Sequence, residues 1–195
     1  MDLKESVTIK NLMRAFAGES QARNRYIFAA QSAEKEKLYN AAALFRYIAE
    51  QEKAHAKIWW NYLRQAGADN VAIQGGFPVD LQTDTLSLLR GAVKNETEET
   101  AVVYPAFARQ ARQDGCPDIA FHFERVGAVE QSHAGKFQRF ADLLEQGKLF
   151  QADGSVQWIC LNCGNLITAS EAPAKCPVCH HEQGYFVRVE LSPFE

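Results

Sequence analysis

The segment IAFHFERVGAVEQSHAGKFQRFADLL, residues 119–144, decides the fold. Its apolar side chains recur in alternating steps of four and three, which is the period of a single buried helix face. Two polar residues, Glu130 and His133, interrupt that face at its middle. The pattern predicts a long helix that opens after Pro117. The complete stripe is Ile119, Phe123, Val126, Glu130, His133, Phe137, Phe140 and Leu144.

Three earlier stretches show the same period and predict helices over residues 7–35, 38–65 and 84–114. We expect Pro105, inside the third of these, to kink its helix because proline lacks a backbone N–H. The stripes run through Ile9, Leu12, Phe16, Glu19, Tyr26 and Ala30, then Leu44, Ile48, Glu52, His55, Trp59 and Tyr62, then Leu86, Leu89, Val93, Glu96, Glu99, Val103 and Phe107.

A long connection, residues 67–83, separates the second predicted helix from the third, whereas the other breaks are short. A helix of about 28 residues is roughly 42 Å long, and about 17 extended residues reach roughly 56 Å. The connection can therefore run the full length of a bundle. The sequence predicts an all-α ferritin-like four-helix bundle with one long crossover over residues 1–147, followed by a small β-rich metal module over residues 148–195.

Each predicted helix carries carboxylates near its middle, on or beside its apolar stripe. Burying an unpaired carboxylate costs several kcal/mol, so such positions need a compensating partner. In residues 52–55 and 130–133 a Glu precedes a His by three, which places both side chains on one helix face. Two such pairs, with a Glu from each other helix, are typical of di-iron or di-manganese carboxylate bundles. The candidate ligands are Glu19, Glu52, His55, Glu96, Glu99, Glu130 and His133.

Any one of these elements has an ordinary interpretation. A Glu-x-x-His pair occurs on many exposed helices, and the acidic run at residues 96–99 is typical of a solvated face. Their joint occurrence at matching depth favours the metal site, and oxygen-rich ligation suits iron or manganese more than copper or zinc. Tyr26 and Tyr104 lie near the candidate ligands, where they are either core aromatics or hydrogen-bond partners of those ligands.

Four of the five cysteines form two Cys-x-x-Cys knuckles, separated by residues 164–175. Two facing knuckles supply four thiolates in a tetrahedron, which holds either zinc or a single iron. The knuckles alone favour zinc, because zinc ribbons are commoner. A redox-active bundle on the same chain favours iron, because iron on thiolates can pass electrons. The candidate ligands here are Cys160, Cys163, Cys176 and Cys179.

The composition excludes several classes of protein. The 195 residues are 47% hydrophobic and 23% charged, as in ordinary globular proteins. A net charge of -3 argues against non-specific nucleic-acid binding, which needs a cationic surface. The chain has no apolar run long enough to span a membrane, and its start lacks the features of a secretory signal. We therefore expect a cytoplasmic protein.

These motifs together resemble the rubrerythrin family across nearly the whole chain. The resemblance rests on FAGESQARNRY at residues 16–26, EKAH at 52–55, the acidic residues ahead of YPAF at 104–107, EQSH at 130–133 and the two knuckles. It implies a peroxidase that reduces hydrogen peroxide to water and protects against oxidative stress. Two iron ions would occupy the bundle, and one iron would occupy the four-cysteine site.

The resemblance also implies a role for each ligand. Glu52 and Glu130 would bridge the two irons. Glu19 and Glu99 would bind one iron, and Glu96 and His133 would bind the other. The first iron would exchange Glu99 for His55 with redox state. The residues expected to act in catalysis are these two and the neighbouring Tyr26 and Tyr104.

The partners follow from the same resemblance. Electrons would come from a donor protein, either a rubredoxin or an NAD(P)H-dependent reductase. The family forms homodimers or larger homo-oligomers, some with helices exchanged between subunits, in which one subunit's cysteine iron reduces the other's di-iron site. Two alternatives stay open: an iron-storage bundle that uses the same carboxylates as a ferroxidase, and a bundle carrying a structural zinc ribbon as an interaction module.

Overall fold

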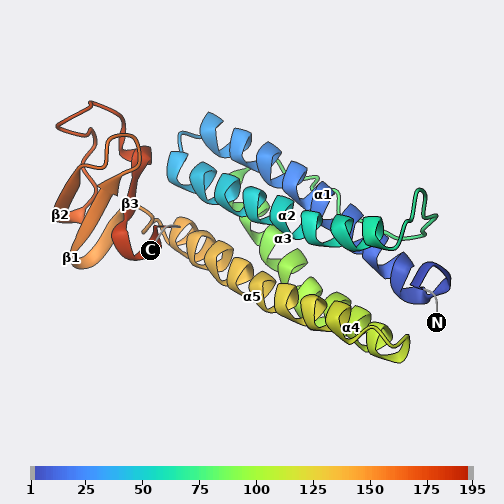
Figure 1. Cartoon of the computed structure of the whole chain (residues 1–195). Helices are drawn as coiled ribbons and strands as arrows, with labels where there is room; N and C mark the ends of the chain where they lie inside the picture. Colours follow the sequence, from blue (N-terminus) through green and yellow to red (C-terminus); the bar gives the residue numbers. More distant parts are fainter. Residues whose placement is uncertain (1–2, 193–195) are drawn as a thin grey trace.

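The computed structural model describes residues 3–192 and consists of a four-helix bundle with a small β-sheet module at one end (Figure 1). The bundle is all-α and ferritin-like with one long crossover, as the sequence predicts. Its helices are α1 (Val7–Lys35), α2 (Tyr39–Gln65), α3 (Thr85–Glu98), α4 (Tyr104–Gln113) and α5 (Pro117–Glu145). Short 3-10 turns span Leu3–Glu5, Gln183–Tyr185 and Val189–Leu191.

Capping side chains fix where two of the helices begin. Ser6 accepts a hydrogen bond from the backbone N–H of Ile9 at 3.2 Å, at the start of α1. Asp84 accepts one from the N–H of Ser87 at 2.9 Å, at the start of α3. Each cap satisfies a backbone donor that has no partner within its own helix, which explains why the helices start at these residues.

The third predicted helix is divided by a π-helical turn, η2 (Glu99–Val103), between α3 and α4. The sequence predicts only a kink at Pro105. Proline lacks an N–H, and its ring clashes with the carbonyl four residues earlier, so a regular α-helix cannot pass through this point. The chain widens instead to a spacing of five, with the N–H of Tyr104 bonded to the carbonyl of Glu99. Such turns are frequent at functional sites.

The long crossover between α2 and α3 runs along α1. Arg14 of α1 donates from Nε to the carbonyl of Gln74 at 3.0 Å. Further along, Arg25 of α1 pairs with Asp80, whose Oδ2 lies 3.0 Å from Nη1. Residue numbers rise together on the two segments, so the crossover travels in the direction of α1 and returns the chain to the end at which α3 starts.

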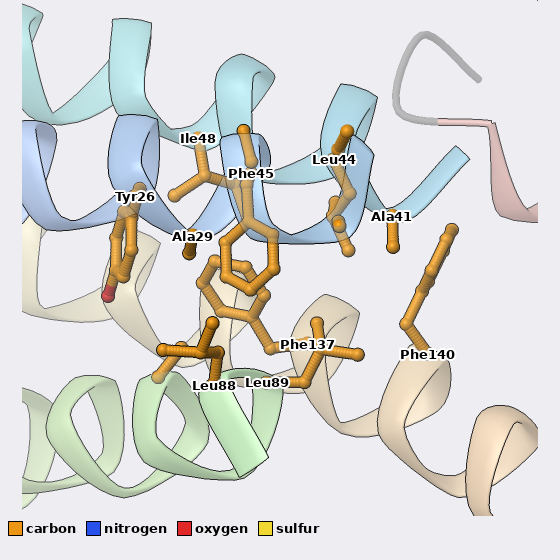
Figure 2. Close-up of a cluster of buried hydrophobic side chains, with 14 of the residues drawn as sticks. Tyr26, Ala29, Ala41, Leu44, Phe45, Ile48, Leu88, Leu89, Phe137 and Phe140 are labelled. Atoms are coloured by element: carbon orange, nitrogen blue, oxygen red, sulfur yellow. The ribbon is translucent and has the colours of Figure 1, made fainter. Parts of the chain in front are cut away.

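Two apolar clusters fill the bundle. One lies toward the β-sheet module and includes Phe45, Leu89 and Phe137, with Tyr26 at its edge (Figure 2). The other lies toward the opposite end and includes Leu12, Trp59 and Phe123. Because the mid-helix polar positions fall between the two clusters in sequence on every helix, the candidate metal ligands are enclosed by apolar side chains on both sides.

The C-terminal module is a three-stranded antiparallel sheet in the order β2-β1-β3. Its strands are β1 (Gln151–Cys160), β2 (Leu166–Glu171) and β3 (Phe186–Arg188). The predicted boundary at residues 147 and 148 falls between the end of α5 and the start of β1. The sheet carries the four-cysteine cluster, so the predicted β-rich metal module is confirmed as a fold.

The module packs on the turn between α1 and α2. Tyr39 and Tyr185 stack with ring centroids 4.1 Å apart, and Asn40 donates to the carbonyl of Phe186 at 3.0 Å. Gly184 makes the closest approach, since a Cβ there would lie 1.8 Å from the carbonyl oxygen of Lys37. This position therefore admits glycine alone without a backbone shift.

We predict that Gly184→Ala loosens the module from the bundle while leaving the helices folded. Overpacking of this kind costs roughly 1–3 kcal/mol, so trypsin cleavage after Lys148 should become about tenfold faster. Gly154→Ala is the matched control, because no atom lies within 4 Å of a Cβ at Gly154. Equal cleavage rates for the two variants would contradict the proposed tight contact.

Candidate metal centres

Six charged or titratable side chains from four helices meet in one buried layer. None of them is more than 8% exposed, although their side chains are among the most costly to bury. They come from the middle of α1, α2, α3 and α5, as the sequence stripes predict. The six are Glu19, Glu52, His55, Glu96, Glu130 and His133.

The first group gathers around His55. Its Nδ1 lies 2.9 Å from Oε1 of Glu130, 3.5 Å from Oε2 of Glu52 and 3.7 Å from Oε2 of Glu19. The ligand atoms of these four residues all lie within 4.8 Å of one another. This spacing suits a single cation held between them.

The second group gathers around His133 in the same manner. Its Nδ1 lies 2.6 Å from Oε2 of Glu130, 2.9 Å from Oε1 of Glu52 and 3.8 Å from Oε2 of Glu96. Glu52 and Glu130 belong to both groups, and each presents one oxygen to each histidine. The arrangement therefore fits two neighbouring cations bridged by two carboxylates.

The atoms that point into the layer are the ones without hydrogen bonds. Among the described residues, no partner is found for Oε2 of Glu19 and of Glu96, for both oxygens of Glu52 and of Glu130, or for Nδ1 of either histidine. Buried polar atoms are nearly always paired, so unpaired atoms that converge on common points indicate ligands that await cations. The residues present thus fit a two-metal carboxylate site.

The outer carboxylates are held by two buried tyrosines. Tyr26 donates its hydroxyl to Oε1 of Glu96, and Tyr104 donates to Oε1 of Glu19. Each carboxylate therefore uses one oxygen for the tyrosine and keeps Oε2 for the layer. Burial, together with the nearby carboxylates, raises the pKa of both tyrosines well above the ordinary value, so both stay protonated donors.

Burial also controls the protonation of the carboxylates. Burial and then the charge of Glu52 raise the pKa of Glu19 to about 8. For Glu96, burial outweighs the attraction of the nearby His133 and raises the pKa to about 8 as well. Without cations both groups hold protons at neutral pH. Cations that bind here must displace protons, which couples metal affinity to pH.

Glu99 stands apart from the six. It begins the π-helical turn and is half-buried, and it is not among the residues whose ligand atoms lie within 4.8 Å of one another. Burial, with the charges of Glu19 and Glu96, raises its pKa well above the ordinary value. In this structure His55 occupies the first group, and the assignment of Glu99 as a ligand stays a prediction.

Two residues of the site were not anticipated from the sequence. Gln51 lies with Oε1 2.9 Å from Nε2 of His133, so it orients the imidazole ring. Gly127 of α5 lies against Tyr104, because a Cβ there would be 2.9 Å from the tyrosine Cβ, and its carbonyl accepts from Thr100 at 3.1 Å. The sequence signal for Gly127 is a glycine inside an otherwise good helix, beside the buried stripe.

The four cysteines form a second centre in the β-sheet module. Their sulfurs lie within 4.8 Å of one another, with Cys160 3.7 Å from Cys179 and Cys163 3.6 Å from Cys176. These separations are too long for disulfides and suit four thiolates around one metal. A hydrogen bond from the backbone of His181 lowers the pKa of Cys179 to about 5, which favours the thiolate form of this cysteine, whereas the pKa values of Cys160 and Cys163 are raised.

Comparisons with known proteins agree with both centres. The rubrerythrin family model matches residues 10–141 and 87–156, and a model for the rubrerythrin rubredoxin-like domain matches residues 158–187. Rubrerythrin of Clostridium perfringens is 40% identical over 94% of this chain and 95% of its own. Rubrerythrin of Porphyromonas gingivalis is 40% identical over 94% of this chain and 90% of its own.

Solved structures support the fold. Partially reduced nigerythrin superposes with a TM-score of 0.63 at 23% identity, covering 95% of this chain and 90% of its own. The Desulfovibrio desulfuricans bacterioferritin superposes with a TM-score of 0.65 at 21% identity, covering 72% of this chain and 81% of its own. None of the described helices is long and apolar enough to cross a membrane. With its buried Glu/His layer, its four-cysteine cluster and these relatives, the chain belongs to the rubrerythrin family.

Proposed function

We propose that this chain is a peroxidase that reduces hydrogen peroxide to water, with two irons in the bundle and one iron on the four cysteines. The observation that carries the proposal is the set of inward ligand atoms without hydrogen bonds, shared between two histidines through Glu52 and Glu130. Membership of the rubrerythrin family supports the activity. The four-cysteine cluster supports an electron inlet.

The donor set favours iron in the bundle. Carboxylate oxygens with two imidazoles suit iron or manganese more than softer metals. The four buried glutamates of the layer balance the charge of two divalent cations, which removes the cost of burying them unpaired. Burial, and then the charge of the nearby Glu19, raise the pKa of a fifth carboxylate, Glu99, well above its ordinary value. It would add negative charge when the cations become trivalent.

The side chains would divide the reaction between them. A ferrous pair, when bound, supplies the two electrons that cleave the O–O bond. Tyr26 and Tyr104 keep the outer carboxylates in position through their hydroxyls. Glu99 lines a cavity that reaches Glu19, and its raised pKa lets its carboxyl hold a proton for the departing oxygen. Apolar clusters cover the layer toward both ends of the bundle.

The alternative functions are separated by the cysteine module. The likeness to bacterioferritin concerns the fold alone. A four-thiolate centre is not expected in an iron-storage protein. A structural zinc ribbon would leave the bundle without its electron inlet. We further propose that the electron donor is a rubredoxin or an NAD(P)H-dependent reductase. The chain would work as a homo-oligomer in the cytoplasm.

The first prediction concerns the metals. Protein reconstituted without oxygen and with excess iron should bind two irons in the bundle and one on the thiolates, because the two ligand sets are separate. Elemental analysis and absorption spectra test this, since ferric iron on four thiolates is coloured and zinc is not. Zinc alone on the cysteines would contradict the proposed electron inlet.

The second prediction separates the modules. Cys160→Ser should impair the thiolate-bound iron and stop steady-state turnover with a protein reductant. The bundle, once chemically reduced, should still be oxidised one time by peroxide, because its ligands lie on other elements. Steady-state turnover that survives unchanged would make the module structural.

The third prediction concerns Glu99. Glu99→Ala should slow oxidation of the diferrous protein by hydrogen peroxide roughly a hundredfold, the usual effect of losing a general acid, while iron still binds through the other six residues. Stopped-flow traces with peroxide and, separately, with dioxygen measure this, with the exposed Glu5→Ala as control. Unchanged rates would remove Glu99 from the site, and wild type that reacts faster with dioxygen would overturn the peroxidase assignment.

A further inference from the structure

A cavity of about 580 Å³ opens beside the metal layer, between α1, the π-helical turn and the crossover. Glu19, Glu99 and Tyr104 line it and are the residues that connect it to the layer. Its other walls are largely apolar and include Phe77, Val102 and Phe107. The cavity therefore has a polar end at the proposed reaction site and an apolar remainder.

This cavity is poorly matched to hydrogen peroxide alone. A water molecule takes up about 30 Å³ of liquid, so a molecule of two oxygens fills a small part of the space. The volume lies instead in the range, roughly 300–1,000 Å³, that binds organic molecules. Apolar walls offer no hydrogen bonds to a small polar solute, so they do not stabilise hydrogen peroxide in the cavity.

The apolar side chains of the walls are also partly exposed. Phe77 is 40% exposed and Val102 is 59% exposed. The crossover brings Phe77 over Gly18, where a Cβ would lie 3.9 Å from its ring. Gly18, Glu19 and Phe77 line the cavity together, and an apolar group placed in it would bury apolar surface that is now exposed.

We propose that this cavity binds organic hydroperoxides, with the alkyl or aryl group against Phe77 and Val102 and the –OOH group at Glu19 and Glu99. The chain then reduces these compounds to alcohols in addition to reducing hydrogen peroxide. The proposal rests on the peroxidase function above and extends its substrate class. The added affinity comes from apolar burial, which hydrogen peroxide cannot provide.

The reaction balances in the same way as for hydrogen peroxide. The O–O bond of ROOH breaks, and the two electrons come from the reduced iron pair of the proposed function, which ends oxidised. Two protons, drawn from solvent through the polar end of the cavity, complete one alcohol and one water. The only reductant needed is the electron donor of the proposed function, which returns the iron pair to its reduced state.

Gly18→Leu is the test variant, because Gly18 lines the cavity, its new side chain would fill space beside Phe77, and leucine favours the helix more than glycine does. Gly135→Leu is the matched control, since no atom lies within 4 Å of a Cβ at this helical position in α5. The probe for binding is 2-phenyl-2-propanol, the alcohol product of cumene hydroperoxide, titrated calorimetrically into the oxidised, iron-loaded full chain. This readout involves no turnover.

We expect wild type and Gly135→Leu to bind the alcohol and Gly18→Leu to bind it roughly tenfold more weakly, the usual cost of overfilling a site. The kcat/KM for cumene hydroperoxide should fall by a similar factor, while that for hydrogen peroxide stays unchanged. Phe77→Ser should also weaken binding, by removing one wall. An equal loss with both peroxides would show damage to the metal layer and overturn the assignment of the cavity.

The two proposals fail in different ways. Wild type that reduces hydrogen peroxide but neither binds the alcohol nor reduces cumene hydroperoxide would overturn the cavity proposal alone. Wild type that binds the alcohol at the cavity but reduces neither peroxide would overturn both the peroxidase function and the extended substrate class.

Discussion

The structure depends on one electrostatic constraint: four glutamates and two histidines must share a buried layer in the middle of the bundle. Four carboxylates in that layer repel one another, and burial shifts the pKa values of Glu19 and Glu96 to about 8. Protons relieve this repulsion in the absence of metal, and two divalent cations relieve it better. The ligand atoms that point into the layer have no hydrogen-bond partner among the described residues, so bound cations would supply the partners they lack. Metal binding and stability of the bundle are therefore linked.

The rest of the bundle holds that layer in position. The tyrosines fix one oxygen of each outer carboxylate, and Gln51 fixes the ring of His133. A π-helical turn starts at Glu99, shortly before Pro105, so the fifth carboxylate lies in a segment whose hydrogen bonds have the wider spacing. Four carboxylates thus lie on regular helices, whereas the fifth lies where the helix is irregular, beside the cavity.

Much of this was predictable because it depends on local spacing. A step of three between Glu52 and His55 fixes a shared helix face, and the stripe around residues 119–144 fixes which face is buried. Three features were not predictable: the π-helical turn, the path of the crossover over Gly18 and the contact of Gly184 with Lys37. The crossover path and the Gly184 contact each depend on two segments distant in sequence. The π-helical turn depends on how a helix rearranges its hydrogen bonds near a proline. The period of apolar residues gives no information about either.

The relative positions of the two centres bear on the proposed assembly. The β-sheet module packs on the turn after Lys35, at one end of the bundle (Figure 1). Glu19 lies near the middle of α1. The sixteen residues from Glu19 to Lys35 rise roughly 24 Å, so about that length of helix lies between the metal layer and the turn that the module contacts. Electron tunnelling falls off exponentially with distance, which makes a transfer within one chain slow. A second copy that brings its module alongside the middle of this bundle would shorten the path, and this separation supports the proposed homo-oligomer as the working form.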